Sequence, residues 1–280
     1  NYKFDFIVDN RPRNQAYREF LISKFIYKVP SIYVLHSFEA SLAFTKYEWL
    51  NRYLYGNQSM VCVSKKGAKK FQELYGLKKI KTIYNTFDFK EITAESNKES
   101  SNLISDDYII SYGRIHDKSK NLKLLIEAYS KSKLKDYKIK LLLMGDGEDV
   151  SLIEALIEKL PIENHIVISG FESNPFPYVK NAMFSVLTSR SEGFAMVIPE
   201  SMCLGTPVVS VNCDAGPKEI ISHEKNGLLI ENHNPVALAN AFNLFVENKE
   251  LYMYCKQNTK KSVEKFSIER ITEKWRALFE

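Results

Sequence analysis

The chain has 280 residues, of which 45% are hydrophobic and 26% are charged. This is the composition of an ordinary globular protein, and it excludes a disordered or collagen-like chain. No apolar run approaches the roughly 18 residues that a membrane-spanning helix needs, and no secretory signal opens the sequence. The length predicts about two domains.

The net charge of +5 is unevenly distributed along the sequence. Residues 1–90 hold 16 Lys and Arg against 7 Asp and Glu, whereas residues 91–280 hold 23 against 27. A basic front and a mildly acidic back indicate two units with different partners.

The metal-binding residue types are scattered. Cys62, Cys203, Cys213 and Cys255 form no C-x-x-C pair, so we expect buried, reduced thiols and a cytoplasmic protein. The five histidines form no H-E-x-x-H, and no two aspartates make a D-x-D clamp. We therefore expect neither a metal nor a cofactor.

The first ninety residues alternate between short β-branched runs and segments of helical period. Strands are expected at Phe4–Val8, Ser31–His36, Met60–Ser64 and Ile80–Asn85, and helices at 14–27, 40–54 and 65–75. With only four strands, and Asn1 rather than Met as first residue, this half is expected to be the later part of a doubly wound domain. The next segment, Lys90–Asp107, lacks an apolar period and is expected to be a linker or long loop.

The alternation then resumes. Strands are expected at Tyr108–Tyr112, Ile139–Met144, His165–Ser169, Phe184–Leu187, Pro207–Val211 and Gly227–Ile230, and helices at 120–132, 148–159, 176–182, 197–204, 216–222 and 235–247. Fully apolar strands such as Leu141–Met144 need cover on both faces, which indicates a parallel sheet between helices. The predicted class is therefore α/β with two doubly wound units, followed by an amphipathic helix at Ser267–Phe279.

Two strand ends carry groups suited to a phosphorylated ligand. Ligands of open α/β sheets bind outside the carboxyl ends of the strands. After the strand at 108–112, Gly113 permits a tight turn, and Arg114 and Lys120 offer positive charge to a diphosphate. A solvated basic loop is the alternative.

The second segment follows the strand at 184–187. Pro199 marks the start of a helix, whose free N–H groups can cradle phosphate oxygens. Glu192 and Glu200 can accept hydrogen bonds from sugar hydroxyls, although Glu200 could merely complement the helix dipole. Neither G-x-G-x-x-G nor a P-loop occurs, which disfavours nicotinamide-linked and P-loop enzymes.

Glu192 and Glu200 form an E-x7-E pattern that is similar to the signature of the retaining, nucleotide-sugar-dependent glycosyltransferases of the GT-B fold, family 4. Further segments resemble this family in the same order: Val61–Ser64, Ile83–Asp88, Gly113–Ala128, Leu143–Gly147 and Ser169–Phe171. Ala195 and Ser201 depart from the family's usual Gly and Ala. The loop from Arg114 to the lysine is one residue longer than usual, so Lys118 competes with Lys120, and the family's first glycine-rich turn is not in the sequence.

The resemblance implies transfer of a sugar, with retention, from a uridine diphosphate hexose or N-acetylhexosamine to an acceptor hydroxyl, in surface glycan or lipid-linked oligosaccharide synthesis. It implies an acceptor-side domain at 1–88, a donor-binding domain at 89–262, and a helix at 263–280 that crosses back to the first domain. A nucleotide-sugar epimerase of the same architecture and a non-catalytic donor-binding subunit are the alternatives.

The resemblance also implies roles for individual residues. Arg114 and Lys120 would stabilise the departing diphosphate, Glu192 would hold the donor sugar, and Glu200 the ribose. The remaining expected site residues are Gly113, Phe171 at the base, the backbone of Gly193, Phe194, Ala195 and Met196 at the phosphate, and His36 near the transferred sugar.

A basic helix stands apart from these motifs. Lys65, Lys66, Lys69 and Lys70 share one face by their i, i+4 spacing. A solvated face is the plain interpretation, and attraction to an anionic membrane that carries lipid-linked acceptors is the alternative. Nucleic acid is not expected, because the face lacks interleaved aromatic residues.

Overall fold

The computed structural model describes residues 4–100 and 104–279. Its first unit has the strands β1 (Ile7–Asp9), β2 (Ser31–Leu35), β3 (Ser59–Cys62) and β4 (Lys79–Thr82). Its helices are α1 (Ala16–Leu21), which continues into a π-helical turn η1 (Ile22–Ile26), α2 (Ala40–Ala43), α3 (Glu48–Tyr55) and α4 (Lys65–Tyr75).

The second unit has the strands β5 (Tyr108–Tyr112), β6 (Lys140–Met144), β7 (Ile166–Gly170), β8 (Ser185–Leu187), β9 (Val208–Val211) and β10 (Gly227–Ile230). Its helical segments are α5 (Phe89–Glu95), α6 (Asp117–Lys120), α7 (Leu122–Lys131), α8 (Val150–Ile157), η2 (Glu163–His165), α9 (Phe176–Asn181), α10 (Val197–Cys203), α11 (Pro217–Ile220), α12 (Pro235–Glu247), α13 (Lys249–Val263), η3 (Glu264–Phe266) and α14 (Ile268–Phe279).

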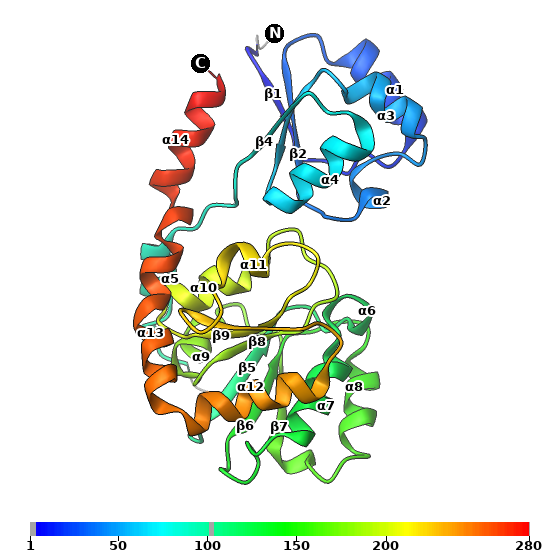
Figure 1. Cartoon of the computed structure of the whole chain (residues 1–280). Helices are drawn as coiled ribbons and strands as arrows, with labels where there is room; N and C mark the ends of the chain where they lie inside the picture. Colours follow the sequence, from blue (N-terminus) through cyan, green and yellow to red (C-terminus); the bar gives the residue numbers. More distant parts are fainter. Residues whose placement is uncertain (1–3, 101–103, 280) are drawn as a thin grey trace.

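The strands form two separate sheets. The first has the order β1-β2-β3-β4 and the second the order β10-β9-β8-β5-β6-β7, and all neighbouring strands are parallel. The prediction of an α/β protein with two parallel sheets is confirmed. Figure 1 shows the two units one above the other, with α13 and α14 running along one side of both.

The second sheet is covered on both faces, as its apolar strands predict. Ile109, Leu141 and Leu143 pack into one hydrophobic cluster, whereas Leu142 and Met144 pack into another. This alternation follows the two-residue period of a strand. The order of the strands also reverses between β5 and β8, and the carboxyl ends on either side of such a reversal leave a crevice for ligands.

The last helix packs by its apolar stripe. Ile271 is buried, and Trp275 and Leu278 pack against the cluster that includes Ile83. The Phe279 ring lies 5.4 Å from the ring of Phe6, beside the first strand of the first sheet. The exact domain boundaries at 88/89 and 262/263 stay a prediction.

The prediction that Lys90–Asp107 lacks regular structure is wrong at its start, where α5 lies. The Asp88 carboxylate caps this helix by accepting from the N–H groups of Lys90 and Glu91. A helix of two turns that buries only Ile92 shows no apolar period, which is why the pattern missed it. Residues 101–103 of this segment lie outside the described residues.

Other helices also differ from the prediction, among them the one expected at 120–132, which is preceded by the separate α6 and begins at Leu122. The helix expected at 40–54 is divided into α2 and α3, because Asn51 Nδ2 donates to the Thr45 carbonyl and Asn51 Oδ1 accepts from Thr45 N–H, which fixes a turn between them. Helix α13 was not expected at all. Its buried residues are Cys255, Thr259 and Val263, a stripe too narrow and too polar to stand out.

None of the helices in the two described segments is both long and apolar enough to cross a bilayer.

Candidate functional site

The loops after β5 and β6 touch beside the reversal between β5 and β8. Gly113 has a φ of 128°, and a Cβ atom at Gly145 would overlap the Gly113 carbonyl oxygen. Both positions therefore require glycine, one for its backbone conformation and the other for the close approach. The contact brings the groups that follow the two strands to one place.

A cavity of about 440 Å³ opens beside these loops. Its lining includes Tyr112, Gly113, Arg114, Asp146 and Phe171. The Phe171 side chain is 75% exposed, so its ring is available for stacking. The structure thus brings together three of the expected site residues, an exposed guanidinium, a glycine backbone and an aromatic ring.

An ion pair joins the two predicted halves of the site. Lys120 Nζ lies 2.7 Å from Glu192 Oε1, and Ser189 Oγ donates to the same oxygen at 2.7 Å. Within the described residues, Glu192 Oε2 has no hydrogen-bond partner. Of the two competing lysines, Lys120 reaches Glu192, whereas Lys118 is exposed.

Glu200 is held by a tyrosine that the sequence did not single out. Tyr112 OH lies 3.2 Å from Glu200 Oε2 and donates to the Val197 carbonyl oxygen at 2.9 Å. Burial raises the pKa of Glu200, and the hydrogen bond from Tyr112 only partly offsets this. The one available signal was a tyrosine at the last position of a strand that ends in the crevice.

The loop at 193–196 belongs to the second unit and contacts the first. A Cβ atom at Gly193 would overlap the carbonyl oxygen of His36, so the loop passes directly over the end of β2. The Phe194 ring is buried among Tyr84 and Phe266, with centroids at 5.4 and 5.1 Å, and can only offer its backbone to a ligand. Ala195 has a left-handed φ of 66°.

Met196, the last residue of this loop, is 40% exposed. Its sulfur lies 3.1 Å from Asn85 Nδ2. The side chain therefore contacts the first unit, and its backbone precedes α10.

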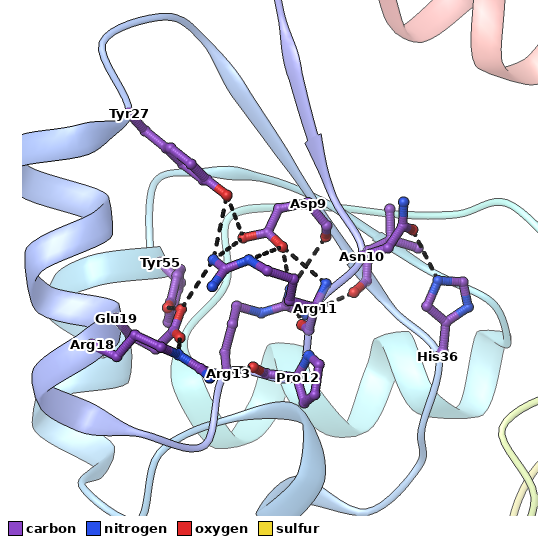
Figure 2. A network of polar contacts seen from close by, with 11 residues as sticks. Asp9, Asn10, Arg11, Pro12, Arg13, Arg18, Glu19, Tyr27, His36 and Tyr55 are labelled. Carbon is purple, nitrogen blue, oxygen red and sulfur yellow. Dashed lines mark hydrogen bonds and ion pairs between the residues drawn. The ribbon is translucent and has the colours of Figure 1, made fainter.

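His36 is held beside this loop by a residue that the sequence analysis did not identify. His36 Nε2 lies 2.9 Å from Asn10 Oδ1 (Figure 2). Burial and the positive charge of Arg13 lower the pKa of His36, so the imidazole is neutral at pH 7. The contact with Gly193 brings His36 next to the second unit, and its place near the transferred sugar stays a prediction.

The four lysines of α4 do not share one environment. Lys70 Nζ donates to the Phe38 carbonyl oxygen and lies 3.8 Å above the Phe38 ring. Lys69 is exposed and 4.0 Å from Glu73, whereas Lys65 and Lys66 line a cavity that faces α11. The membrane-binding interpretation of this face stays a prediction.

The part of the chain that the structure describes has no group of three or more His, Cys, Asp or Glu placed to hold a metal ion. Its four cysteines are buried and unpaired, and burial raises the pKa of Cys62 to about 11. Thiol chemistry is thus disfavoured at neutral pH.

A family model described as glycosyl transferases group 1 matches residues 93–262. Among curated proteins, a Campylobacter jejuni N-acetylgalactosamine-N,N'-diacetylbacillosaminyl-diphospho-undecaprenol 4-alpha-N-acetylgalactosaminyltransferase is 30% identical over 69% of this chain and 52% of its own length. A Staphylococcus aureus poly(ribitol-phosphate) alpha-N-acetylglucosaminyltransferase is 30% identical over 70% and 41%. The chain spans about half the length of the curated relatives it matches.

Solved structures support the same fold. Anabaena HepE in complex with UDP superimposes with a TM-score of 0.81 at 22% identity, over 98% of this chain and 78% of that one. A glycosyltransferase from Rickettsia africae gives 0.81 at 20% identity, over 98% and 76%. The predicted GT-B fold is confirmed.

Proposed function

The chain belongs to the glycosyl transferases group 1 family, and from this premise we propose that it binds a nucleotide diphosphate sugar at the ends of β5 and β8 and transfers the sugar, with retention, to an acceptor hydroxyl. The observation that carries the proposal is the Lys120–Glu192 ion pair, which joins the two motifs on either side of the sheet reversal. Both Lys120 and Arg114 also line one narrow cavity of about 20 Å³.

In the proposed reaction, negative charge grows on the diphosphate as the bond to the sugar breaks. Arg114 and Lys120 would stabilise that charge from fixed positions, which lowers the barrier more than it tightens ground-state binding. Glu192 Oε2 would accept a hydrogen bond from the donor sugar. Glu200 Oε1, which has no partner among the described residues, would accept one from the ribose.

The remaining predicted residues take supporting roles. Phe171 would stack on the base, the backbone of Gly193, Phe194, Ala195 and Met196 would contact phosphate, and the neutral His36 would accept a hydrogen bond from the sugar.

We propose a uridine diphosphate hexose or N-acetylhexosamine as donor. The UDP bound to Anabaena HepE and the N-acetylhexosaminyltransferase names of the two bacterial relatives support this choice. Their names also support an acceptor in surface glycan or lipid-linked glycan synthesis. We further propose that the protein works in the cytoplasm, at the inner face of the membrane where lipid-linked acceptors lie.

The test compares two neighbouring lysines. Lys120→Met should weaken UDP binding by about tenfold or more, since a charged hydrogen bond is worth about 1.5–3 kcal/mol. Lys118→Met, which removes the same charge from an exposed position two residues away, should change it by less than about twofold. Calorimetry with UDP, GDP and ADP measures both effects and identifies the base.

Equal losses in the two variants, or no binding of any of the three nucleotides, would reject the proposed donor site. Sugar transfer from the bound donor is then followed with and without acceptor. Release of sugar without acceptor would indicate an epimerase, and donor binding without any turnover would indicate a binding subunit.

A further inference from the structure

A further cavity lies between the two units, and none of the predicted donor residues lines it. Helix α4, on the side of the first unit that faces the second, stands opposite α11 (Figure 1). The cavity between them has a volume of about 350 Å³. Its polar lining consists of Lys65, Lys66, Asn212, Asp214, Lys218 and Glu219.

Glu219 makes no ion pair with the side chains of Lys65, Lys66 or Lys218, and both of its oxygens accept hydrogen bonds from other groups. Oε2 accepts from Lys65 N–H and from Tyr84 OH, each at 2.9 Å, and Oε1 accepts from Lys66 N–H at 3.0 Å. The carboxylate therefore caps the start of α4 across the two units. The end of this helix is filled, and a ligand must be bound by side chains.

In the part of the chain that the structure describes, the ammonium groups of Lys65, Lys66 and Lys218 form no ion pair, and Lys66 Nζ lies 5.7 Å from the centroid of the Phe38 ring. Among the described residues, none of the three has a carboxylate within 4 Å. Lys265 adds to the positive charge, since its Nζ donates to the Glu219 carbonyl oxygen at 3.2 Å. Burial, and then the charge of Lys65, lowers the pKa of Lys265, in keeping with an excess of positive charge here.

The cavity adjoins the predicted donor-sugar residues. A Cβ atom at Gly216, which lines it, would lie 2.7 Å from the Phe194 carbonyl oxygen in the loop at 193–196. The charges of Glu192 and Asp214 both act on the Cys213 thiol, whose pKa is raised mainly by burial. A ligand in the cavity would thus lie next to the transferred sugar.

We propose that this cavity is the acceptor subsite, and that it takes an acceptor with a phosphate ester beside its hydroxyl groups. The inference rests on the proposed function. The three ammonium groups would bind the phosphate, and Asp214 and Asn212 would accept hydrogen bonds from hydroxyls. An acceptor oxygen bonds to the anomeric carbon as the bond from that carbon to the diphosphate breaks, and the hydroxyl proton passes to the departing diphosphate.

The experiment measures binding of sn-glycerol 3-phosphate to the whole chain, with and without UDP, and uses glycerol as the uncharged control. The double variant Lys66→Gln/Lys218→Gln should bind sn-glycerol 3-phosphate at least about tenfold more weakly. Lys69→Gln, which removes a charge from the same helix outside the cavity, should change it by less than about twofold. UDP affinity, measured for each variant, reports separately on the donor site.

A second arm replaces the probe with phosphatidylglycerol vesicles, and phosphatidylcholine vesicles serve as control. Vesicle binding that needs Lys66 and Lys218 but not Lys69 would support a lipid-borne phosphate in the same cavity. Equal dependence on Lys69 would indicate a general membrane face and overturn the proposal, as would equal affinity for glycerol and sn-glycerol 3-phosphate. If the unmodified chain does not bind UDP, the proposed function is rejected, irrespective of its affinity for sn-glycerol 3-phosphate.

Discussion

The carboxylates of Asp9, in the first unit, and of Glu192 and Glu200, in the second, differ in how many of their oxygens have hydrogen-bond partners. At the end of β1, Asp9 Oδ2 accepts from Arg11 Nη2 at 2.7 Å, and Asp9 Oδ1 accepts from the Arg11 backbone N–H at 2.9 Å (Figure 2). In the second unit, Glu192 in the loop after β8 and Glu200 on α10 each keep one oxygen without a partner among the described residues. We call Asp9, Arg11 and Arg13 the closed cluster, because both Asp9 oxygens are satisfied, although the buried Arg13 Nε has no partner among the described residues. Glu192 and Glu200 are the open cluster, which can still accept hydrogen bonds from a ligand.

The pKa values of Asp9 and Glu200 are shifted in opposite directions. Burial acts to raise the pKa of Asp9, but the hydrogen bonds and charges of Arg11 and Arg13 leave it lowered. Glu200 has only the neutral Tyr112 hydroxyl beside it, and burial leaves its pKa raised. A buried charge that lacks a cation is costly until donors arrive, which a ribose diol would supply. The closed cluster thus shapes the fold, and the open one suits binding.

Among the substitutions we propose, the one at Arg13 should disrupt the closed cluster most, because its side chain is 1% exposed. Its guanidinium donates to the carbonyl oxygens of Asp9 at 3.3 Å, Arg11 at 2.8 Å and Val34 at 2.7 Å, and it lies 3.9 Å from the Asp9 carboxylate. We expect Arg13→Met to lower the free energy of unfolding by about 3–5 kcal/mol, because the buried Asp9 carboxylate and three carbonyl oxygens lose a partner. Urea unfolding, followed by Trp49 fluorescence in a Trp275→Phe background, measures this.

The matched control for that change is Arg52→Met. Arg52 is exposed and donates only to the Leu74 carbonyl oxygen, so its loss should cost no more than about 0.5 kcal/mol. A loss below about 1 kcal/mol for Arg13→Met would show that the cluster does not stabilise the first unit.

The open cluster should respond in the opposite way to Glu200→Gln. Donor binding should weaken by about 1–3 kcal/mol, since a charged hydrogen bond to the ribose is lost. Stability at neutral pH should rise, because the charge that burial penalises is gone. Calorimetry with UDP and urea unfolding across the pH range measure the two effects on one protein.

The sign of the pH dependence follows from the raised pKa of Glu200. The unmodified chain loses stability as the pH rises from the ordinary value of 4.5 through the raised value. The variant has no such loss, so the two stabilities should converge below that range and separate above it. If Glu200→Gln destabilises at pH 7 while UDP binding is unchanged, Glu200 belongs to the fold and the comparison fails.

Sequence patterns predict features that are set by residues close together in the chain. Gly113 and Arg114 directly follow β5, the E-x7-E pair lies in the loop and helix after β8, and the sheet order brings these segments together. The contact of Glu219 with the start of α4 joins residues 154 and 153 positions apart, so no local pattern could reveal it. The same is true of Asn10 and His36, 26 positions apart. Such pairs depend on how the two sheets and their loops meet in space.

The smallest effect we expect concerns backbone strain in the open region. Ala195 holds a left-handed φ of 66°, which costs an L-residue about 1–2 kcal/mol. Ala195→Gly would relieve this strain. It would also remove one buried methyl group, which costs about 0.8 kcal/mol, and increase the conformational entropy of the unfolded chain, which costs about 0.5–1 kcal/mol. These terms nearly cancel, so stability should change by less than about 1 kcal/mol.

Ala128→Gly is the control, since Ala128 is fully buried within α7 and the substitution should cost about 2 kcal/mol. Equal losses of stability in the two variants would show that the backbone at Ala195 carries no strain.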